Sequence, residues 1–161
     1  MATNHKSRSA ILAGAKLVIA EVGSYQANMI DIAARSAVSR ATVYNHFSDK
    51  SEMFLALLES EIARLAHGAK SCATPAEGIF YLSRQISEDP ALAAIRRLDP
   101  TDLARLVSSA DHPLWAVASE SLKKLFGSNS EIILRWLIGQ IGAPLSEQES
   151  RAQADQLVFA L

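Results

Sequence analysis

The chain has 161 residues, and its 49% apolar and 20% charged residues exclude a wholly disordered polypeptide. The formal net charge is −1, but it is unevenly distributed along the chain. Residues 1–50 hold six Lys and Arg against three Asp and Glu, whereas the remaining 111 residues hold ten against fourteen, so a basic N-terminal part precedes an acidic body.

Prolines and capping residues divide the chain into helices. Proline is tolerated in the first helical turn, and Pro75, Pro90, Pro100 and Pro113 each follow a residue that can cap a helix. No segment alternates as a strand does, so we predict an all-α fold. The expected helices cover about residues 7–22, 29–35, 39–46, 49–67, 75–87, 90–97, 100–109, 113–126, 129–141 and 146–160.

The first predicted helix has an apolar stripe and ends at Gly23. Lys16 and Glu21 interrupt its apolar residues, which argues against a signal peptide. The side chains expected to face the core are Ile11, Ala15, Leu17, Val18 and Val22.

The next two helices are short and separated by only three residues, which predicts a helix-turn-helix. Asn28 can cap the first of them, on which Ile32 and Ala33 face the core. Val38, Val43 and Phe47 are the expected anchors of the turn and second helix. In a helix-turn-helix protein the second helix enters the major groove of DNA.

The outer side of residues 39–46 is rich in groups that bind DNA. Arginine pairs with guanine edges, asparagine pairs with adenine edges, and hydroxyl groups bind phosphates. These groups belong to Arg40, Thr42, Tyr44, Asn45 and His46. Ordinary packing remains an alternative for Tyr44. A metal-binding role for His46 is disfavoured because no second ligand lies at suitable spacing.

The stretch AVSRATVYNHFSDKSEMF resembles the DNA-binding motif of TetR-type transcriptional regulators, and the resemblance extends from about Ile11 to Leu58. It implies a DNA-binding domain over 1–48 and a helical regulatory and dimerisation domain over 49–161, with the helix at about 49–67 as connector. It also implies two sets of DNA contacts. The first set binds phosphates, and the second binds base edges or neighbouring phosphates. The phosphate set is Asn28, Thr42, Tyr44 and Lys50, and the second set is Ser39, Arg40, Asn45 and His46.

Two positions depart from the family pattern. Ala37 stands in the turn, where the family usually has glycine. If the turn requires a positive φ, alanine costs roughly 1 kcal/mol there. Asn28 stands where the family often has threonine, which weakens the phosphate role implied for it.

The body begins after a boundary near 68–74, which contains the single cysteine, Cys72. One cysteine excludes an internal disulfide and fits a reducing cytoplasm. The apolar stripe over 75–126 is more often core than pocket. If an effector pocket is present, the resemblance makes it largely apolar, and its proposed lining residues are Phe80, Tyr81, Arg84 and Trp115.

The last two helices carry a wide apolar face that we expect to pack against a second copy of the chain. Burial within the chain is the alternative. The expected interface residues are Ile133, Trp136, Leu137, Gln140, Ile141, Leu157 and Phe159. The segment IILRWLIGQIGAPL is too short to span a membrane, so we expect a cytoplasmic protein without membrane contact.

These features predict a homodimeric repressor that binds a near-palindromic DNA operator and is released by a small, largely apolar effector. The alternative is a dimeric regulator without such an effector, controlled by a protein partner or by concentration. The sequence shows no catalytic constellation, so we expect neither an enzyme nor a bound cofactor or metal.

Overall fold

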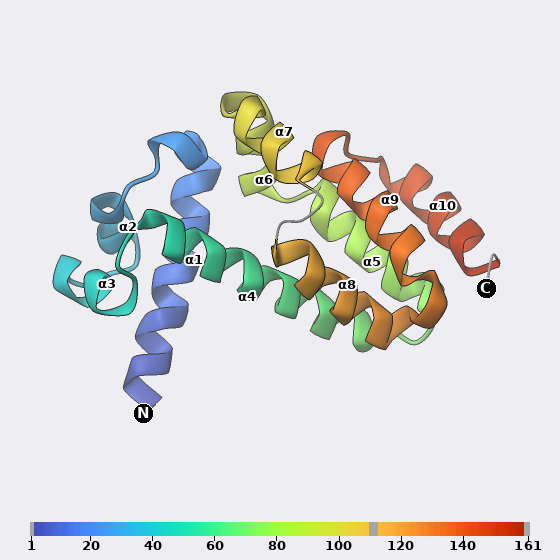
Figure 1. Cartoon of the computed structure of the whole chain (residues 1–161), viewed down its shortest axis with the longest axis horizontal. Helices are drawn as coiled ribbons and strands as arrows, with labels where there is room; N and C mark the ends of the chain where they lie inside the picture. The colour runs from blue at the N-terminus through green and yellow to red at the C-terminus, as the bar shows by residue number, and fades with distance from the viewer. Residues whose placement is uncertain (1, 110–112, 160–161) are drawn as a thin grey trace.

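The computed structural model describes residues 2–109 and 113–159, and their side chains from position 5 to 158. The predicted all-α fold is confirmed, and the described residues contain no strand (Figure 1). The elements are α1 (Ala2–Gln26), α2 (Met29–Arg35), α3 (Arg40–His46), α4 (Lys50–Lys70), α5 (Pro75–Ser87), α6 (Pro90–Leu98), α7 (Pro100–Ser108), α8 (Pro113–Phe126), the 3₁₀ helix η1 (Gly127–Asn129), α9 (Ser130–Gly142) and α10 (Glu147–Phe159).

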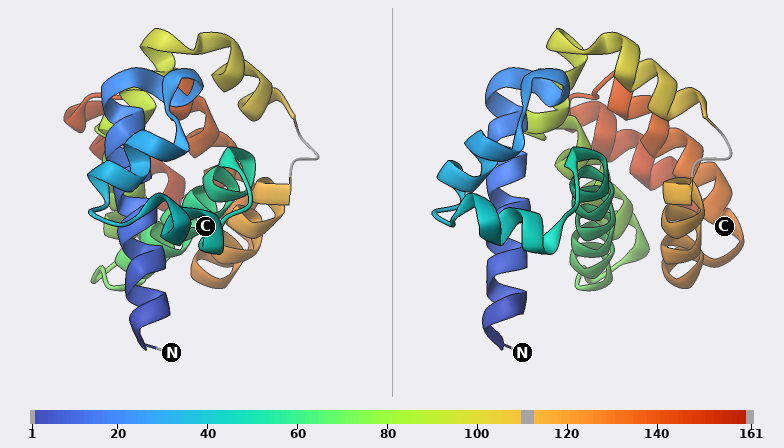
Figure 2. Two further views of the ribbon diagram at one scale, coloured as in Figure 1. Left: turned by 90° about the vertical axis from the view of Figure 1, so that its left-hand side faces the viewer. Right: turned by 60° about the vertical axis from the view of Figure 1, so that its left-hand side comes forward.

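The helices form a head and a body (Figures 1 and 2). Helices α1, α2 and α3 lie together at one end of the molecule, and α4 runs from them into the body of α5 to α10. None of the described helices combines the length and apolarity needed to cross a bilayer. Helix α6 packs against α1, so head and body meet at more than the connector helix.

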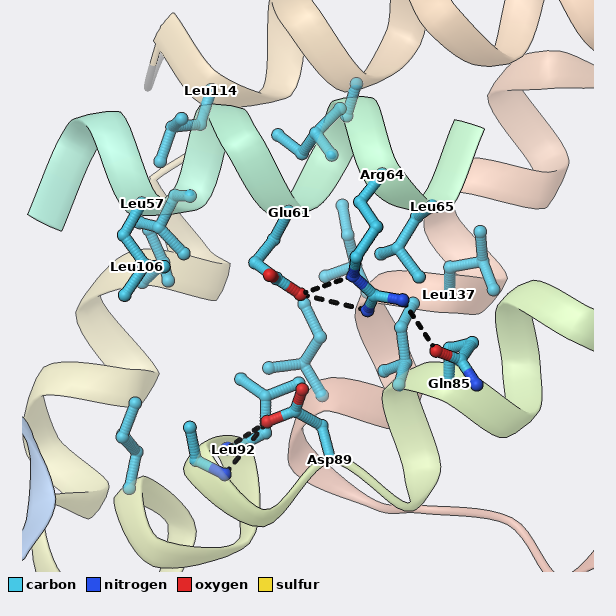
Figure 3. A pocket seen from close by; sticks show the side chains of 18 of the residues that line it. Leu57, Glu61, Arg64, Leu65, Gln85, Asp89, Leu92, Leu106, Leu114 and Leu137 are labelled. Carbon is cyan, nitrogen blue, oxygen red and sulfur yellow. Dashed lines mark hydrogen bonds and ion pairs between the residues drawn. The ribbon is translucent and has the colours of Figure 1, made fainter. Parts of the chain in front are cut away.

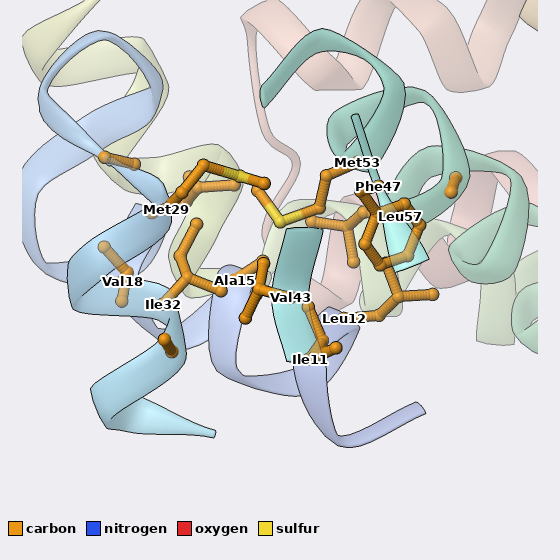
Figure 4. Close-up of a cluster of buried hydrophobic side chains, with 14 of the residues drawn as sticks. Ile11, Leu12, Ala15, Val18, Met29, Ile32, Val43, Phe47, Met53 and Leu57 are labelled. Atoms are coloured by element: carbon orange, nitrogen blue, oxygen red, sulfur yellow. The ribbon is translucent and has the colours of Figure 1, made fainter. Parts of the chain in front are cut away.

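The head is held together by one cluster of buried apolar side chains (Figure 4). Of the predicted anchors, Val43 and Phe47 are buried in it and Val38 is partly buried against it, and the core-facing Ile32 is also buried. The cluster continues into α4 through Met53 and Leu57 and reaches Ala91 of α6. The buried core therefore includes residues on both sides of the predicted domain boundary between residues 48 and 49. The division of the chain into a DNA-binding and a regulatory domain stays a prediction.

Two side chains expected in this core lie outside it. Leu17 is 52% exposed and Val22 is 38% exposed. At 100° per residue Leu17 points roughly 120° away from Ile11, so it cannot share the buried face of α1. Val22 lies next to a kink at Gly23, where the helical geometry is interrupted.

The first helix bends at Gly23 instead of ending there. Gly23 has φ 81, and a Cβ atom on it would lie 2.4 Å from Oδ2 of Asp99. The same carboxylate accepts hydrogen bonds from Ser24 Oγ at 3.0 Å and from the Tyr25 backbone N–H at 3.1 Å. Glycine is required here both for its left-handed backbone and for the close approach of Asp99.

A buried polar network joins α5, α9 and α10 inside the body. Ser83 Oγ lies 2.6 Å from Gln140 Oε1 and 2.8 Å from Ser150 Oγ. Ser87 Oγ donates to the same Gln140 oxygen at 3.1 Å. These hydroxyls and the Gln140 amide are buried, and hydrogen bonding offsets the cost of removing them from water.

Three of the residues expected at a dimer surface are instead core residues of this chain. Ile133, Leu137 and Gln140 are at most 5% exposed, which corrects their predicted interface role in favour of intrachain burial. Trp136, Ile141 and Leu157 are half-buried, and Trp136 Nε1 donates to Gln153 Oε1 at 2.6 Å. The side chain expected at position 159, a phenylalanine, lies outside the described residues.

Candidate nucleic-acid interface

Side-chain caps fix the start of both short helices. Asn28 Oδ1 accepts hydrogen bonds from the backbone N–H groups of Ile30 and Asp31, both at 3.0 Å, so its predicted capping role is confirmed. Ser39 Oγ caps α3 by accepting from the Thr42 N–H at 3.0 Å. Each cap satisfies N–H groups that a helix start leaves without an intrahelical partner.

The turn between α2 and α3 is a Schellman motif. The Val38 N–H donates to the Ala33 carbonyl at 3.1 Å, and the Ala37 N–H donates to the Ala34 carbonyl at 3.2 Å. Ala37 occupies the left-handed position with φ 54. The condition under which alanine is unfavourable in this turn, a positive φ, is therefore met.

The outer face of α3 presents polar groups without internal partners. Tyr44 is 54% exposed, and Arg40 and Asn45 are also exposed. Within the described part of the chain, these three side chains make no hydrogen bond or ion pair. Buried Val43 and Phe47 hold the opposite side of the helix in the core. The outer face can therefore insert into a DNA groove without breaking any internal contact.

Three other residues predicted to contact DNA have partners inside the head. The Thr42 hydroxyl is half-buried and lies 2.8 Å from Ser39 Oγ. His46 Nε2 lies 2.7 Å from Ser7 Oγ of α1. Ser39 and Thr42 hydroxyls can still accept or donate one further bond each, because a hydroxyl has one donor and two acceptor sites.

Lys50 is directed towards the backbone at the end of α1. Its Nζ donates to the carbonyl groups of Ser24, Tyr25 and Ala27 at 3.1, 2.9 and 3.1 Å. All three protons of the ammonium group are used, so the structure argues against the phosphate contact expected for Lys50. Through these hydrogen bonds Lys50 connects the start of α4 to the segment where α1 ends and α2 begins.

Arg8 of α1 is a neighbour of α3 that the sequence reasoning missed. Its guanidinium group lies 5.3 Å from the centre of the Phe47 ring. Arg8 and Ile11 are three residues apart and so lie on neighbouring positions of α1, which was the available signal. The start of α1 thus adds positive charge beside α3.

An apolar cavity of about 310 Å³ lies between the body helices α4 to α9 and α1 of the head (Figure 3). Leucine side chains form much of its wall. Those labelled in Figure 3 are Leu57, Leu65, Leu92, Leu106, Leu114 and Leu137. This volume and lining suit a small apolar ligand.

Only one of the four predicted pocket residues, Trp115, lines this cavity. Phe80 lies under the guanidinium group of Arg151, 3.6 Å from it. Arg84 donates to the Leu145 carbonyl at 3.0 Å, and Tyr81 packs against Gly68. Phe80, Tyr81 and Arg84 therefore serve packing between body helices, which corrects their predicted ligand-binding role.

A charged network forms one end of the cavity. Lys16 Nζ lies between Glu61 Oε2, at 2.7 Å, and Asp89 Oδ2, at 2.6 Å. Arg64 donates to Glu61 from Nε and Nη2 at 3.1 and 2.9 Å, and to Gln85 Oε1 at 2.8 Å. Partial burial lowers the pKa of Lys16, but its bonds to the two carboxylates outweigh this effect and raise that pKa above its usual value.

The head has the architecture of a helix-turn-helix DNA-binding protein. Three helices share one core, a tight turn joins α2 to α3, and the outer face of α3 is exposed to solvent. Residues 11–57 match the family model described as bacterial regulatory proteins, tetR family. The chain thus carries a TetR-type helix-turn-helix head, as the resemblance predicted.

Curated relatives match about half of the chain or less. The HTH-type transcriptional repressor AcnR of Corynebacterium efficiens is 33% identical over 84 residues, which are 52% of this chain and 42% of that protein. The HTH-type transcriptional activator FasR of Mycolicibacterium smegmatis is 36% identical over 63 residues, or 39% of this chain and 29% of that protein. The matched region therefore spans less than half the length of these relatives.

Solved structures share the fold over nearly the whole chain. The TetR family repressor AlkX from Dietzia sp. strain DQ12-45-1b superposes with a TM-score of 0.67 at 21% identity, covering 95% of this chain and 94% of AlkX. The fatty acid degradation regulator FadR from Bacillus halodurans gives 0.67 at 19% identity, covering 94% and 93%. At this identity the likeness concerns the fold alone.

Proposed function

We propose that the chain is a DNA-binding transcriptional regulator that reads a near-palindromic operator as a homodimer. The observation that carries this proposal is the exposed outer face of α3, where Arg40, Tyr44 and Asn45 have no partner within the described residues. In the free protein these exposed groups are hydrated, and they are of the types that bind base edges and phosphates. The TetR-type head supports the same function.

Within this proposal the residues divide into two roles. Arg40 and Asn45 are assigned to base edges, because their side chains can form paired hydrogen bonds to guanine and adenine. Tyr44, together with the hydroxyl groups of Ser39 and Thr42, is assigned to phosphates. Asn28 and His46 already have intramolecular partners, so their contact with DNA is secondary.

The proposed dimer needs a different surface on α9 from the one first expected. Ile132 is 56% exposed, and Gly139 is exposed with open space where its Cβ would lie. These residues are seven apart and therefore share one face of α9. In a dimer packed through this face, the two α3 helices would have to lie about one DNA turn, roughly 34 Å, apart to enter successive major grooves.

A small, largely apolar effector is the proposed signal for release. The leucine-lined cavity supports it, because the cavity lies on α4, which joins the head to the body. AlkX is described as implicated in biodegradation of n-alkanes, and a Bacillus subtilis FadR structure holds stearoyl-CoA. A ligand that favours one body conformation would shift the separation of the heads and so the affinity for DNA.

Selection of bound duplexes from a random DNA pool tests the proposal. The full chain should enrich a two-fold symmetric sequence, and gel shifts should show much tighter binding to that sequence than to its scrambled version at the same salt concentration. Equal affinity for both would contradict specific regulation. Release of the enriched DNA by a hydrophobic metabolite would favour the effector-controlled regulator over the alternative without an effector.

A further inference from the structure

The charged end of the cavity is electrically balanced within the part of the chain that the structure describes. Lys16 faces both Glu61 and Asp89, and Arg64 faces Glu61. Asp102, which also lines the cavity, pairs with Arg105 at 3.7 Å. A charged ligand group placed here would have to break an existing pair or remain unpaired in a partly buried site, and both are unfavourable.

A second, polar recess adjoins the same wall. Its volume is about 270 Å³. Lys16, Arg64, Gln85 and Asp89 line both this recess and the apolar cavity, so the two spaces share these side chains. Glu88, which lines only the recess, pairs with Arg84. The recess therefore offers polar surroundings without an unpaired charge among the described residues.

Gln85 has an unused hydrogen-bond donor on this wall. Arg64 Nη1 donates to Gln85 Oε1 at 2.8 Å, and because a guanidinium group can only donate, the Gln85 oxygen must be the atom that faces it. The amide nitrogen consequently points away from Arg64 (Figure 3). Within the described residues Gln85 Nε2 makes no hydrogen bond.

We infer that the cavity binds an uncharged amphiphile, whose hydroxyl or carbonyl oxygen accepts a hydrogen bond from Gln85 Nε2 and whose aliphatic part lies among the leucines. This inference rests on the proposed effector function and adds the chemical class of the ligand. The balanced pairs disfavour carboxylates and ammonium groups, and the free donor selects a ligand with an acceptor atom. The leucine wall supplies affinity in proportion to the apolar surface that it buries.

A set of eight-carbon compounds with one tail and three head groups tests this inference. The neutral fluorescent probe N-phenyl-1-naphthylamine, bound to the full chain at about pH 7.5, is displaced with 1-octanol, octanoate or octylammonium, the last two being fully charged at that pH. Octanol should displace the probe at a concentration at least about tenfold lower than either ion. Equal or tighter binding of either ion would overturn the inference.

Two variants assign the effect to Gln85. Gln85→Glu keeps the acceptor for Arg64, removes the donor and adds a negative charge. The affinity for octanol should therefore fall by about threefold to tenfold, while the affinity for octylammonium rises. Gln85→Met removes the donor without adding charge and should weaken octanol alone. Gln148→Glu, the same change at an exposed position of α10, is the control and should alter neither.

The possible failures are distinguishable. If Gln85→Glu and Gln85→Met bind octanol as the original chain does, the assignment to Gln85 is wrong. If none of the three compounds displaces the probe, the cavity is not a site for such ligands and the inference fails with the proposed effector. Selection of operator DNA does not depend on either result and tests the DNA-binding function separately.

Discussion

Lys16 Nζ lies 2.6 Å from Asp89 Oδ2, and this contact connects the first helix of the head to the beginning of α6 in the body. The other carboxylate oxygen of Asp89 caps α6 by accepting from the N–H groups of Ala91 and Leu92 at 2.9 and 3.0 Å. One carboxylate thus both starts α6 and holds α1. The position of the head therefore depends on a charged contact at the edge of the apolar cavity.

Lys16→Met should destabilise the folded chain by about 1 to 2 kcal/mol at neutral pH. The estimate lies between those for exposed and fully buried ion pairs, because the Lys16 side chain is 26% exposed. Urea unfolding followed by circular dichroism measures the change. Lys124→Met is the control, since its pair with Glu120 is exposed on both sides, and it should change stability by no more than a few tenths of a kcal/mol.

The effect of Lys16→Met should also depend on pH. The folded state raises the pKa of Lys16, so the stabilisation is fully present below the pKa of the unfolded chain, about 10.4. It is lost as the pH rises through the higher pKa of the folded state. The difference between the two proteins should stay constant from about pH 7 to 9 and shrink at higher pH. A difference that grows with alkalinity would contradict the assigned ion pair.

Ala37→Gly should stabilise the chain by about 1 kcal/mol. Alanine is strained at φ 54, whereas glycine adopts this conformation readily, and this gain exceeds the extra entropy of glycine in the unfolded state. Thermal and urea unfolding show whether the free energy of unfolding rises or falls. Ala13→Gly, on the exposed side of α1, is the matched control and should destabilise by about 1 kcal/mol. If both changes destabilise equally, the turn is not strained.

Tyr44→Phe should weaken binding to all DNA sequences alike, because it removes one phosphate contact from the exposed face of α3. Arg40→Ala should weaken binding to the selected operator by about 1 to 3 kcal/mol and also relax the preference at one base pair. Gel shifts on the operator and its point variants measure both effects. Tyr81→Phe, in the body, should leave DNA binding unchanged. Equal losses on every sequence for Arg40→Ala would make Arg40 a phosphate contact.

Ser83→Ala should destabilise the body by about 1 to 3 kcal/mol. It leaves the buried Ser150 hydroxyl without its hydrogen-bond partner and removes one of the two donors to Gln140 Oε1. Urea unfolding measures the loss. Ser119→Ala, on a half-buried surface of α8, should cost far less. Similar losses at both sites would mean that the network adds nothing beyond ordinary helix packing.

Local signals made the helices and the head predictable from sequence. Asn28 and the proline residues mark helix starts through contacts within a few positions, so the bounds predicted for the helices that they start lie close to those observed. Helix α1 is longer than predicted and spans Ala2–Gln26 instead of about 7–22. Val43 and Phe47 are large apolar residues in a polar stretch, and they could only face inward. The turn at Ala37 follows from its neighbours alone, because the Schellman hydrogen bonds join residues at most five apart.

The remaining features could not be predicted from the sequence, because they depend on contacts between residues that are far apart in the chain. Lys50 bonds to carbonyl groups 23 to 26 positions earlier, and nothing local distinguishes a lysine that does so from one that faces solvent. Gln140 and Ser83 are 57 residues apart, so an amide on an apolar helix looked like an interface residue. The cavity is a space left between seven helices, α1 and α4 to α9, and its walls depend on how those helices pack.

The shared core of Met53, Leu57 and Ala91 has a practical consequence for protein engineering. A chimaera that grafts residues 1–48 onto an unrelated body would expose the apolar surface that these three residues cover. Such a graft needs the first two turns of α4 and a small residue on α6 at the place of Ala91. Exchange of DNA specificity is therefore better attempted by replacing the exposed side chains of α3 within the intact chain.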